Sequence, residues 1–184
     1  MDAKGFEDIE NFYLAYKARF KEYGQINSLK DIPKVLIMHW GGIIIEAYVK
    51  YLLVKNTGSE KDRKKLWYTI EKFNDIVIQG NLPKNKYSEY SCAENPGHVI
   101  EKGVKSIDVL DDLLTDDTSI IDDIKNITYP LGKITKNGFI DLRYIAPESI
   151  EDLDDLFTIW NNSFKHLLKW LMDNTKYIGV KLDE

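Results

Sequence analysis

Three histidines are the residues of this chain best suited to acid–base chemistry, because an unperturbed imidazole titrates near neutral pH. His39 lies in a long apolar stretch, His98 follows a Pro-Gly pair, and His166 lies towards the end of the chain. His39, Gly42 and Glu46 are spaced by three and four residues, which places them on one face of a helix. A histidine on an apolar helix is more often a hydrogen-bonded core residue than a ligand, and this is our interpretation of His39.

The remaining residue types and spacings argue against several classes of site. The sequence contains no HxxxH pair, no glycine-rich phosphate loop and no serine in a GxSxG turn. Carboxylates near the start of the last predicted helix are stabilised by the helix dipole, which explains them without a metal: Glu151, Asp152, Asp154 and Asp155. We therefore expect no metal site and no cofactor, and nothing marks a nucleotide-dependent enzyme or a hydrolase.

Composition and charge favour a cytoplasmic protein of one domain, spanning 1–184. A net charge of −5 offers no broad basic face for binding phosphates. The single cysteine, Cys92, excludes an internal disulfide. The first residues lack the apolar core of a signal peptide. The apolar run at 33–56 contains His39, Glu46 and Lys50, which we interpret as too polar for a membrane span.

This apolar run, 33–56, is predicted to form the central helix of the fold. Apolar residues recur in it at steps near three and four, as a buried stripe requires: Val35, Met38, Ile43, Ala47, Tyr48, Tyr51 and Leu52. Gly41 and Gly42 each weaken a helix by about 1 kcal/mol relative to alanine, so we expect another backbone to pass close to them. The terminal helix is expected to clamp this central helix.

The predicted fold is all-α, an antiparallel bundle of about five helices. Helical periodicity places the other helices at 6–23, 60–79, 96–114 with a short continuation at 118–127, and 149–173. Residues 81–95 lack periodicity, and for Tyr87 and Tyr90 an exposed polar loop is favoured over a partner-contact patch. Asn137-Gly138 is typical of a tight turn, so 131–145 is predicted to be either a short hairpin or an ordered loop packed on the helices.

Turn and capping residues indicate where these helices begin and end. Gly24 is expected to end the first helix and Thr118 to cap the helix at 118–127, while Ser149 with Asp152 fits a cap for the last one. One face of the first helix is rich in aromatic residues and is interpreted as core packing: Ile9, Phe12, Tyr13, Tyr16 and Phe20.

The order of these elements resembles the HEPN family of prokaryotic helical-bundle proteins over residues 30 to 173. The resembling residues are His39-Trp40-Gly41-Gly42 followed by IEAYVKYLL, the Pro-Gly-His98 helix start, and Leu142-Arg143-Tyr144 with Pro147 before the final helix. Many HEPN proteins are metal-independent ribonucleases, whereas others are non-catalytic partners or antitoxin-linked modules. The resemblance implies a dimer that brings the final helices of two copies into one cleft.

The resemblance also implies a catalytic site on the final helix, formed by an arginine, a polar residue and a histidine. In such a site the histidine moves a proton and the arginine stabilises the charge that develops on the phosphate. In this sequence His166 is present, and Asn161 or Asn162 supplies the polar residue, but the arginine is missing. Arg143 reaches the site only if the fold places it there. The candidate catalytic residues are therefore His166, Asn161 and Arg143.

Three functions remain open at this point. The missing arginine and the acidic charge favour a non-catalytic HEPN-like domain that forms a homodimer or binds a protein or nucleotide partner. The second function is that of a ribonuclease that acts on RNA through His166. The third is an unrelated helical bundle with an unknown ligand, which a structure lacking an antiparallel core of the central and final helices would favour.

Overall fold

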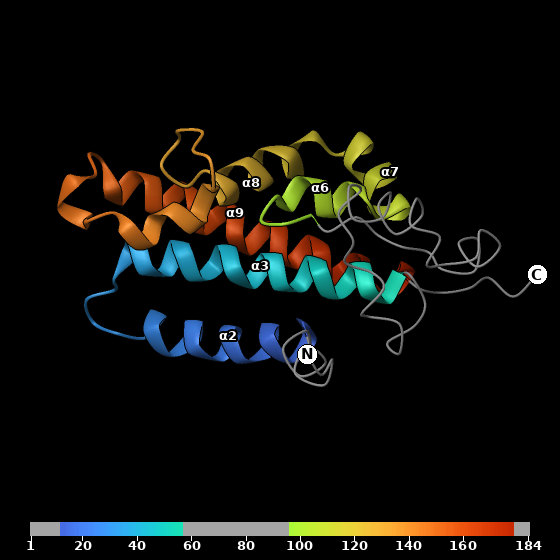
Figure 1. Ribbon diagram of the computed structural model, residues 1–184, viewed down its shortest axis with the longest axis horizontal. Coiled ribbons are helices and arrows are strands. Elements are labelled where there is room, and N and C mark those ends of the chain that lie inside the picture. The colour runs from blue at the N-terminus through green and yellow to red at the C-terminus, as the bar shows by residue number, and fades with distance from the viewer. Residues whose placement is uncertain (1–11, 57–95, 179–184) are drawn as a thin grey trace, which may run out of the picture.

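The computed structural model describes residues 12–56 and 96–178, and every regular element in these two stretches is helical. The elements are α2 (Phe12–Asn27), α3 (Lys34–Asn56), α6 (Ile100–Lys105), α7 (Asp108–Asp116), α8 (Thr118–Thr128), η3 (Gly138–Tyr144), η4 (Pro147–Ser149), α9 (Leu153–Asn174) and η5 (Thr175–Tyr177). Figure 1 shows α3 along the middle, with α2 on one side and α6 to α9 on the other. The all-α prediction is confirmed. The helix expected at 60–79, the loop at 81–95 and Cys92 lie outside the described residues.

Helix α3 is the buried centre of the described fold, as predicted. It contacts α2, α6, α8, α9 and η3. A helix that is apolar on all sides is stable in water only when other elements surround it. Accordingly, five of its large side chains have no exposed surface: Ile37, Met38, Ile44, Ile45 and Leu52. Since α9 is one of the contacting elements, the prediction that the terminal helix packs on the central one is also confirmed.

The polar residues of α3 do not lower its hydropathy as far as the sequence interpretation assumed. By length and composition alone, Lys34–Leu53 is apolar enough to cross a membrane, and it is the one such helix among the described residues. Within the fold, 67% of that window is buried. The core helix of a folded domain has the same composition, because protein surrounds it in place of lipid.

Two neighbouring glycines of α3 allow aromatic rings to approach its backbone. A Cβ atom at Gly41 would lie 2.4 Å from the ring of Trp160, and one at Gly42 would lie 2.3 Å from the ring of Phe139. Both distances are far shorter than any real van der Waals contact. The close approach expected at these glycines is therefore present, but side chains of α9 and η3 make it, and the expected neighbouring backbone does not.

Two pairs of neighbouring α-helices run antiparallel, as predicted for the bundle. This holds for α2 with α3 and for α8 with α9 (Figure 1). Helices α3 and α9, however, run parallel, because Lys34 pairs with Asp154 near their starts and Tyr48 Oη lies 2.7 Å from Thr175 Oγ1 near their ends. The prediction of an antiparallel core of the central and final helices is therefore wrong for this pair. If the chain direction reverses at each step from α2 to α3, α8 and α9, then α3 and α9 point the same way.

The aromatic face of α2 is only partly core. Tyr16 and Tyr23 are buried, and this burial raises the pKa of both phenols. Tyr13 and Phe20 are 43% and 42% exposed, so they line the edge of the interface with α3. Helix α2 also continues past Gly24, where a Cβ atom would meet nothing within 4 Å.

The capping residues differ from the predicted ones. Asp117, not Thr118, caps α8, because its Oδ1 accepts a hydrogen bond from the backbone N–H of Ser119 at 3.1 Å. The Ser119 hydroxyl also donates to this carboxylate, and this is the largest reason that the pKa of Asp117 lies below its usual value.

The helix predicted at 96–114 is interrupted at 106–107, which separates α6 from α7.

The final helix starts later than predicted, because its expected cap makes another bond. The Ser149 hydroxyl donates to the carbonyl oxygen of Ala146 within η4. Helix α9 then begins at Leu153, preceded by Asp152 at a left-handed φ of 53° and without a side-chain cap.

The segment at 131–145 adopts the ordered alternative and not the hairpin. Gly138 has a φ of +59°, and a Cβ atom there would lie 2.5 Å from the carbonyl oxygen of Thr128, so only glycine fits. The chain then forms the 3-10 helix η3, which buries Phe139, Ile140 and Leu142. This spacing of one and two residues matches a tight helical turn and not the strict alternation of a strand. The turn thus fixes Phe139 against α3.

Candidate functional site

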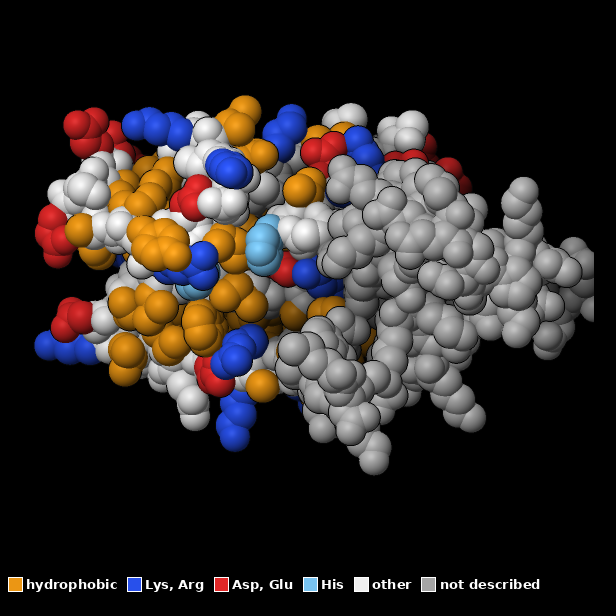
Figure 2. Space-filling view, viewed as in Figure 1, with side chains coloured by type: hydrophobic (Ala, Val, Ile, Leu, Met, Phe, Trp, Pro, Cys, Tyr) orange, Lys and Arg blue, Asp and Glu red, His pale blue; other side chains and the backbone are white. Residues whose placement is uncertain are grey.

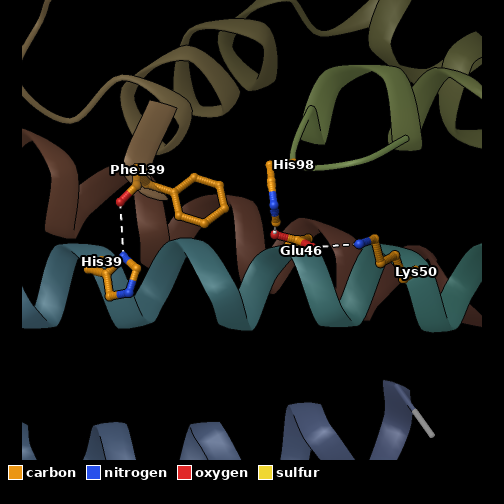
Figure 3. A network of polar contacts seen from close by, with 5 residues as sticks. All are labelled: His39, Glu46, Lys50, His98 and Phe139. Carbon is orange, nitrogen blue, oxygen red and sulfur yellow. Dashed lines mark hydrogen bonds and ion pairs between the residues drawn. The ribbon is translucent and has the colours of Figure 1, made fainter. Parts of the chain in front are cut away.

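A network of polar side chains crosses from α3 to the segments that precede α6 and form η3. Glu46 on α3 binds two partners: its Oε1 accepts from Lys50 Nζ at 2.6 Å, and its Oε2 lies 2.8 Å from His98 Nδ1. Figure 3 shows this pair of contacts next to Phe139, with His39 on the other side of that ring. The ring of His98 meets the Phe139 ring edge-on at 6.4 Å. Phe139 therefore links the two histidines on this side of α3.

The carboxylate of Glu46 and the ammonium of Lys50 are nearly buried. The Glu46 side chain is 14% exposed and that of Lys50 is 13%, whereas His98 is 54% exposed. Gly97 adopts a φ of +60° just before His98, which turns the chain so that the imidazole reaches the acid. A carboxylate that binds Nδ1 orients the imidazole and leaves Nε2 directed away from the acid.

His39 has the hydrogen bond expected of a core histidine. It is 8% exposed, and its Nδ1 lies 2.9 Å from the backbone oxygen of Phe139. A carbonyl oxygen can only accept, so Nδ1 carries a hydrogen, and in the neutral form of an imidazole this leaves a lone pair on Nε2. Among the described residues no polar atom is hydrogen-bonded to that Nε2, and the one fully buried side-chain atom without a partner is Trp160 Nε1. The interpretation of His39 as a hydrogen-bonded core residue therefore holds for Nδ1, which has a partner, but not for Nε2, which has none among the described residues.

Next to His39 lies a cavity of about 300 Å³ between the start of α3 and the η3–η4 region. Its lining is apolar except for His39 and Arg143: Pro33, Val35, Leu36, Leu142, Ile145 and Pro147 complete it. Figure 2 shows hydrophobic side chains gathered over this half of the molecule, with histidine atoms visible beside them. A mainly apolar cavity with a few polar groups is typical of a ligand site.

The predicted catalytic residues do not come together. His166 lies on the surface of α9, 53% exposed, and its Nδ1 is 2.6 Å from Oδ2 of Asp123 on α8. Arg143 lines the cavity with His39, and its guanidinium lies 4.7 Å from the centre of the Tyr144 ring. Asn161, five residues before His166, is partly buried on α9 and is turned about 140° away from it around the helix. Asn162, four residues before His166, is exposed and shares its face.

Sequence reasoning missed Asp123 and Phe139 as parts of these sites. Asp123 is spaced three residues from Ile120 and four from Ile127, so it borders the buried stripe of α8. A carboxylate in such a position needs a partner, and this spacing was the available signal. For Phe139 no signal existed, because its role depends on a backbone carbonyl placed by η3.

Comparisons with protein-family models, curated proteins and solved structures found no match to this chain. Within 12–56 and 96–178, no three histidine, cysteine or acidic side chains converge as metal ligands would. The described residues thus offer two carboxylate–imidazole pairs and the apolar cavity beside His39, which one cation and one imidazole line. A second cavity, of about 370 Å³, lies between α2, Tyr48 of α3 and Met172 of α9, and two lysines line it.

Glu46 is predicted to stabilise the fold through its two partners. Replacing it with alanine leaves Lys50 nearly buried and unpaired, so we expect the free energy of unfolding to fall by about 1–3 kcal/mol. Urea denaturation measures the change. As a control, Glu101→Ala removes the surface pair with Lys105 on α6 and should have no measurable effect. Equal effects of the two substitutions would show that the Glu46 network adds nothing.

Proposed function

We propose that this chain is a HEPN-like helical domain that acts as a homodimer by binding a partner, and that it does not cleave RNA. The observation that supports this proposal is the position of Arg143. Arg143 lines the cavity beside His39, whereas the side-chain hydrogen-bond partner of His166 is Asp123. Phosphodiester cleavage of the HEPN type needs a cation that stabilises the phosphate beside the histidine that moves the proton. His166 has a carboxylate as its partner instead.

The electrostatics around His166 point the same way. Asp117 is a second carboxylate near this imidazole. The pKa of Asp117 is lowered mainly by the hydrogen bonds from Ser119, and the charge of a protonated His166 lowers it further. Two carboxylates near the imidazole repel the negatively charged backbone of RNA. A phosphate would have to displace or neutralise them before it could reach His166.

The experiment compares the wild-type protein with His166→Ala on a mixed-sequence single-stranded RNA. We expect both proteins to leave the RNA intact, because no arginine of the described residues is bonded beside His166 to stabilise the transition state. Gel electrophoresis of end-labelled RNA measures the result. RNA products that the wild-type protein forms and His166→Ala does not would refute the non-catalytic proposal.

The dimer is tested on the same preparation by light scattering coupled to size-exclusion chromatography. We expect twice the chain mass of 21.4 kDa. A monomer over the whole accessible concentration range would contradict the dimer.

A ribonuclease remains the second candidate because of the bond between Asp123 and His166. A carboxylate at Nδ1 fixes the tautomer and leaves Nε2 available for proton transfer, as in many acid–base catalysts. An unrelated helical bundle is the third. The parallel direction of α3 and α9 counts in favour of this third candidate, because the antiparallel core of the central and final helices that the HEPN-like interpretation predicts is absent.

A further inference from the structure

We propose that the cavity between α3 and the η3–η4 region binds a small apolar carboxylate that also carries one hydrogen-bond donor. This inference rests on the proposed binding function and deepens it by naming the chemistry of a ligand. Three features of the cavity carry the inference: an imidazole acceptor without a protein partner, apolar walls and one cation.

The acceptor is Nε2 of His39. The side chain is more than nine-tenths buried, and its Nδ1–H is already committed to the backbone oxygen of Phe139. His39 lines the cavity, and no described residue bonds to its Nε2. Among the described residues Trp160 Nε1 is the one fully buried side-chain atom without a partner, so solvent reaches His39 Nε2, and a ligand N–H or O–H that enters the cavity can replace that water.

The walls determine the body of the ligand. Six of the eight lining residues are aliphatic or proline, and they come from both sides of the cavity, the start of α3 and the η3–η4 region. The volume of about 300 Å³ lies at the lower end of the range for ligand pockets. A ring or a branched aliphatic group fits these walls, whereas a ligand polar on all sides would lose its hydration there.

Arg143 supplies the only charge among the lining residues. Its residue is exposed, so the guanidinium lies at the open side of the cavity, and its contact with the Tyr144 ring limits its freedom. Among the described residues no ion pair engages it. The nearby carboxylate of Asp141 is hydrogen-bonded to the Asn137 side chain at 2.8 Å. A guanidinium pairs best with a planar carboxylate, which it binds through two parallel hydrogen bonds.

The test uses indole-3-acetate, which has an apolar ring, one N–H donor and one carboxylate. Two analogues isolate its groups: 1-methylindole-3-acetate lacks the donor, and indole-3-acetamide lacks the charge. Isothermal titration calorimetry of the full chain measures each affinity. We expect saturable binding of indole-3-acetate and about tenfold weaker binding of each analogue, as the loss of one charged or buried hydrogen bond implies.

Two variants assign these losses to residues. His39→Asn keeps an amide N–H for the Phe139 oxygen but has no atom in place of Nε2, so it should bind indole-3-acetate and its N-methyl analogue equally. Arg143→Gln should bind the acetate and the acetamide equally. Arg19→Gln is the matched control, because Arg19 bonds to Glu22 on α2 outside this cavity, and its binding should be unchanged.

The proposal is overturned if neither indole-3-acetate nor 4-hydroxyphenylacetate, a second member of the class, binds at millimolar concentration. It is also overturned if the wild-type protein binds the N-methyl analogue and the acetamide as tightly as the parent, a result that needs no variant to fold. Either failure would leave the dimer and RNA experiments unaffected. Conversely, RNA cleavage that depends on His166 would refute the proposed function without changing these affinities.

Discussion

Gly42→Val is expected to lower the free energy of unfolding by about 3 kcal/mol. The Phe139 ring lies where the new side chain would go, 2.3 Å from an ideal Cβ position, and Phe139 itself has no exposed surface into which it could move. Inserting extra carbon atoms into a filled core usually costs about 1–3 kcal/mol, and valine adds three of them. Alanine at the same position should cost less, because it recovers about 1 kcal/mol of helix propensity.

Urea denaturation followed by circular dichroism measures this change, and Gly24→Ala provides the matched control. Gly24 also lies inside a helix, but nothing lies within 4 Å of its Cβ position, so alanine there should raise the free energy of unfolding by about 0.5–1 kcal/mol. Opposite signs at the two positions are the signature of the close ring contact. Stabilisation by alanine or valine at Gly42 would contradict the packing of Phe139 against α3.

Phe139→Ala is expected to cost about 3–5 kcal/mol, the range for removing a buried aromatic ring. The ring is fully buried and contacts α3 at Gly42 and the His98 imidazole on its edge. Because η3 is only a short 3-10 helix, its attachment to the bundle rests on a few buried side chains, of which Phe139 is the largest. Loss of this side chain should also loosen the carbonyl that bonds to His39.

Two measurements test this prediction. Urea denaturation gives the stability, and nitrogen-15 shifts of the His39 ring report whether Nδ1 still carries the hydrogen. Ile134→Ala is the control, since that side chain is 85% exposed and its loss should change stability by less than about 0.5 kcal/mol. A loss of stability with an unchanged His39 tautomer would show that η3 keeps its place without the ring.

The general architecture followed from local sequence patterns. The apolar run of α3, the breaks at prolines and the amphipathic repeat of α9 are properties of neighbouring residues, and they predicted an all-helical body around a central helix. The sequence also indicated that a neighbour passes close to Gly41 and Gly42, because these glycines weaken α3 without an evident local reason. What touches them was not recognisable, since Trp160 and Phe139 lie about one hundred residues away in the chain.

The candidate site could be predicted only in part, for the same reason. His39 was correctly interpreted as a hydrogen-bonded core residue, but its partner is a backbone oxygen that carries no sequence signal. Arg143 was considered for the site of His166, whereas the turn at Gly138 directs η3 so that Arg143 lines the His39 cavity. Likewise, the pairing of His166 with Asp123 depends on how α8 and α9 pack.

The two adjacent glycines of α3 have a consequence for how this sequence can vary. They point about 100° apart around the helix, and each accommodates a ring from a different element, α9 for Gly41 and η3 for Gly42. One added or deleted residue within α3 would rotate one half of it relative to the other and put side chains in the path of both rings. Homologous chains should therefore differ in length in the connection at 28–33, while their alignment over 34–53 remains free of gaps.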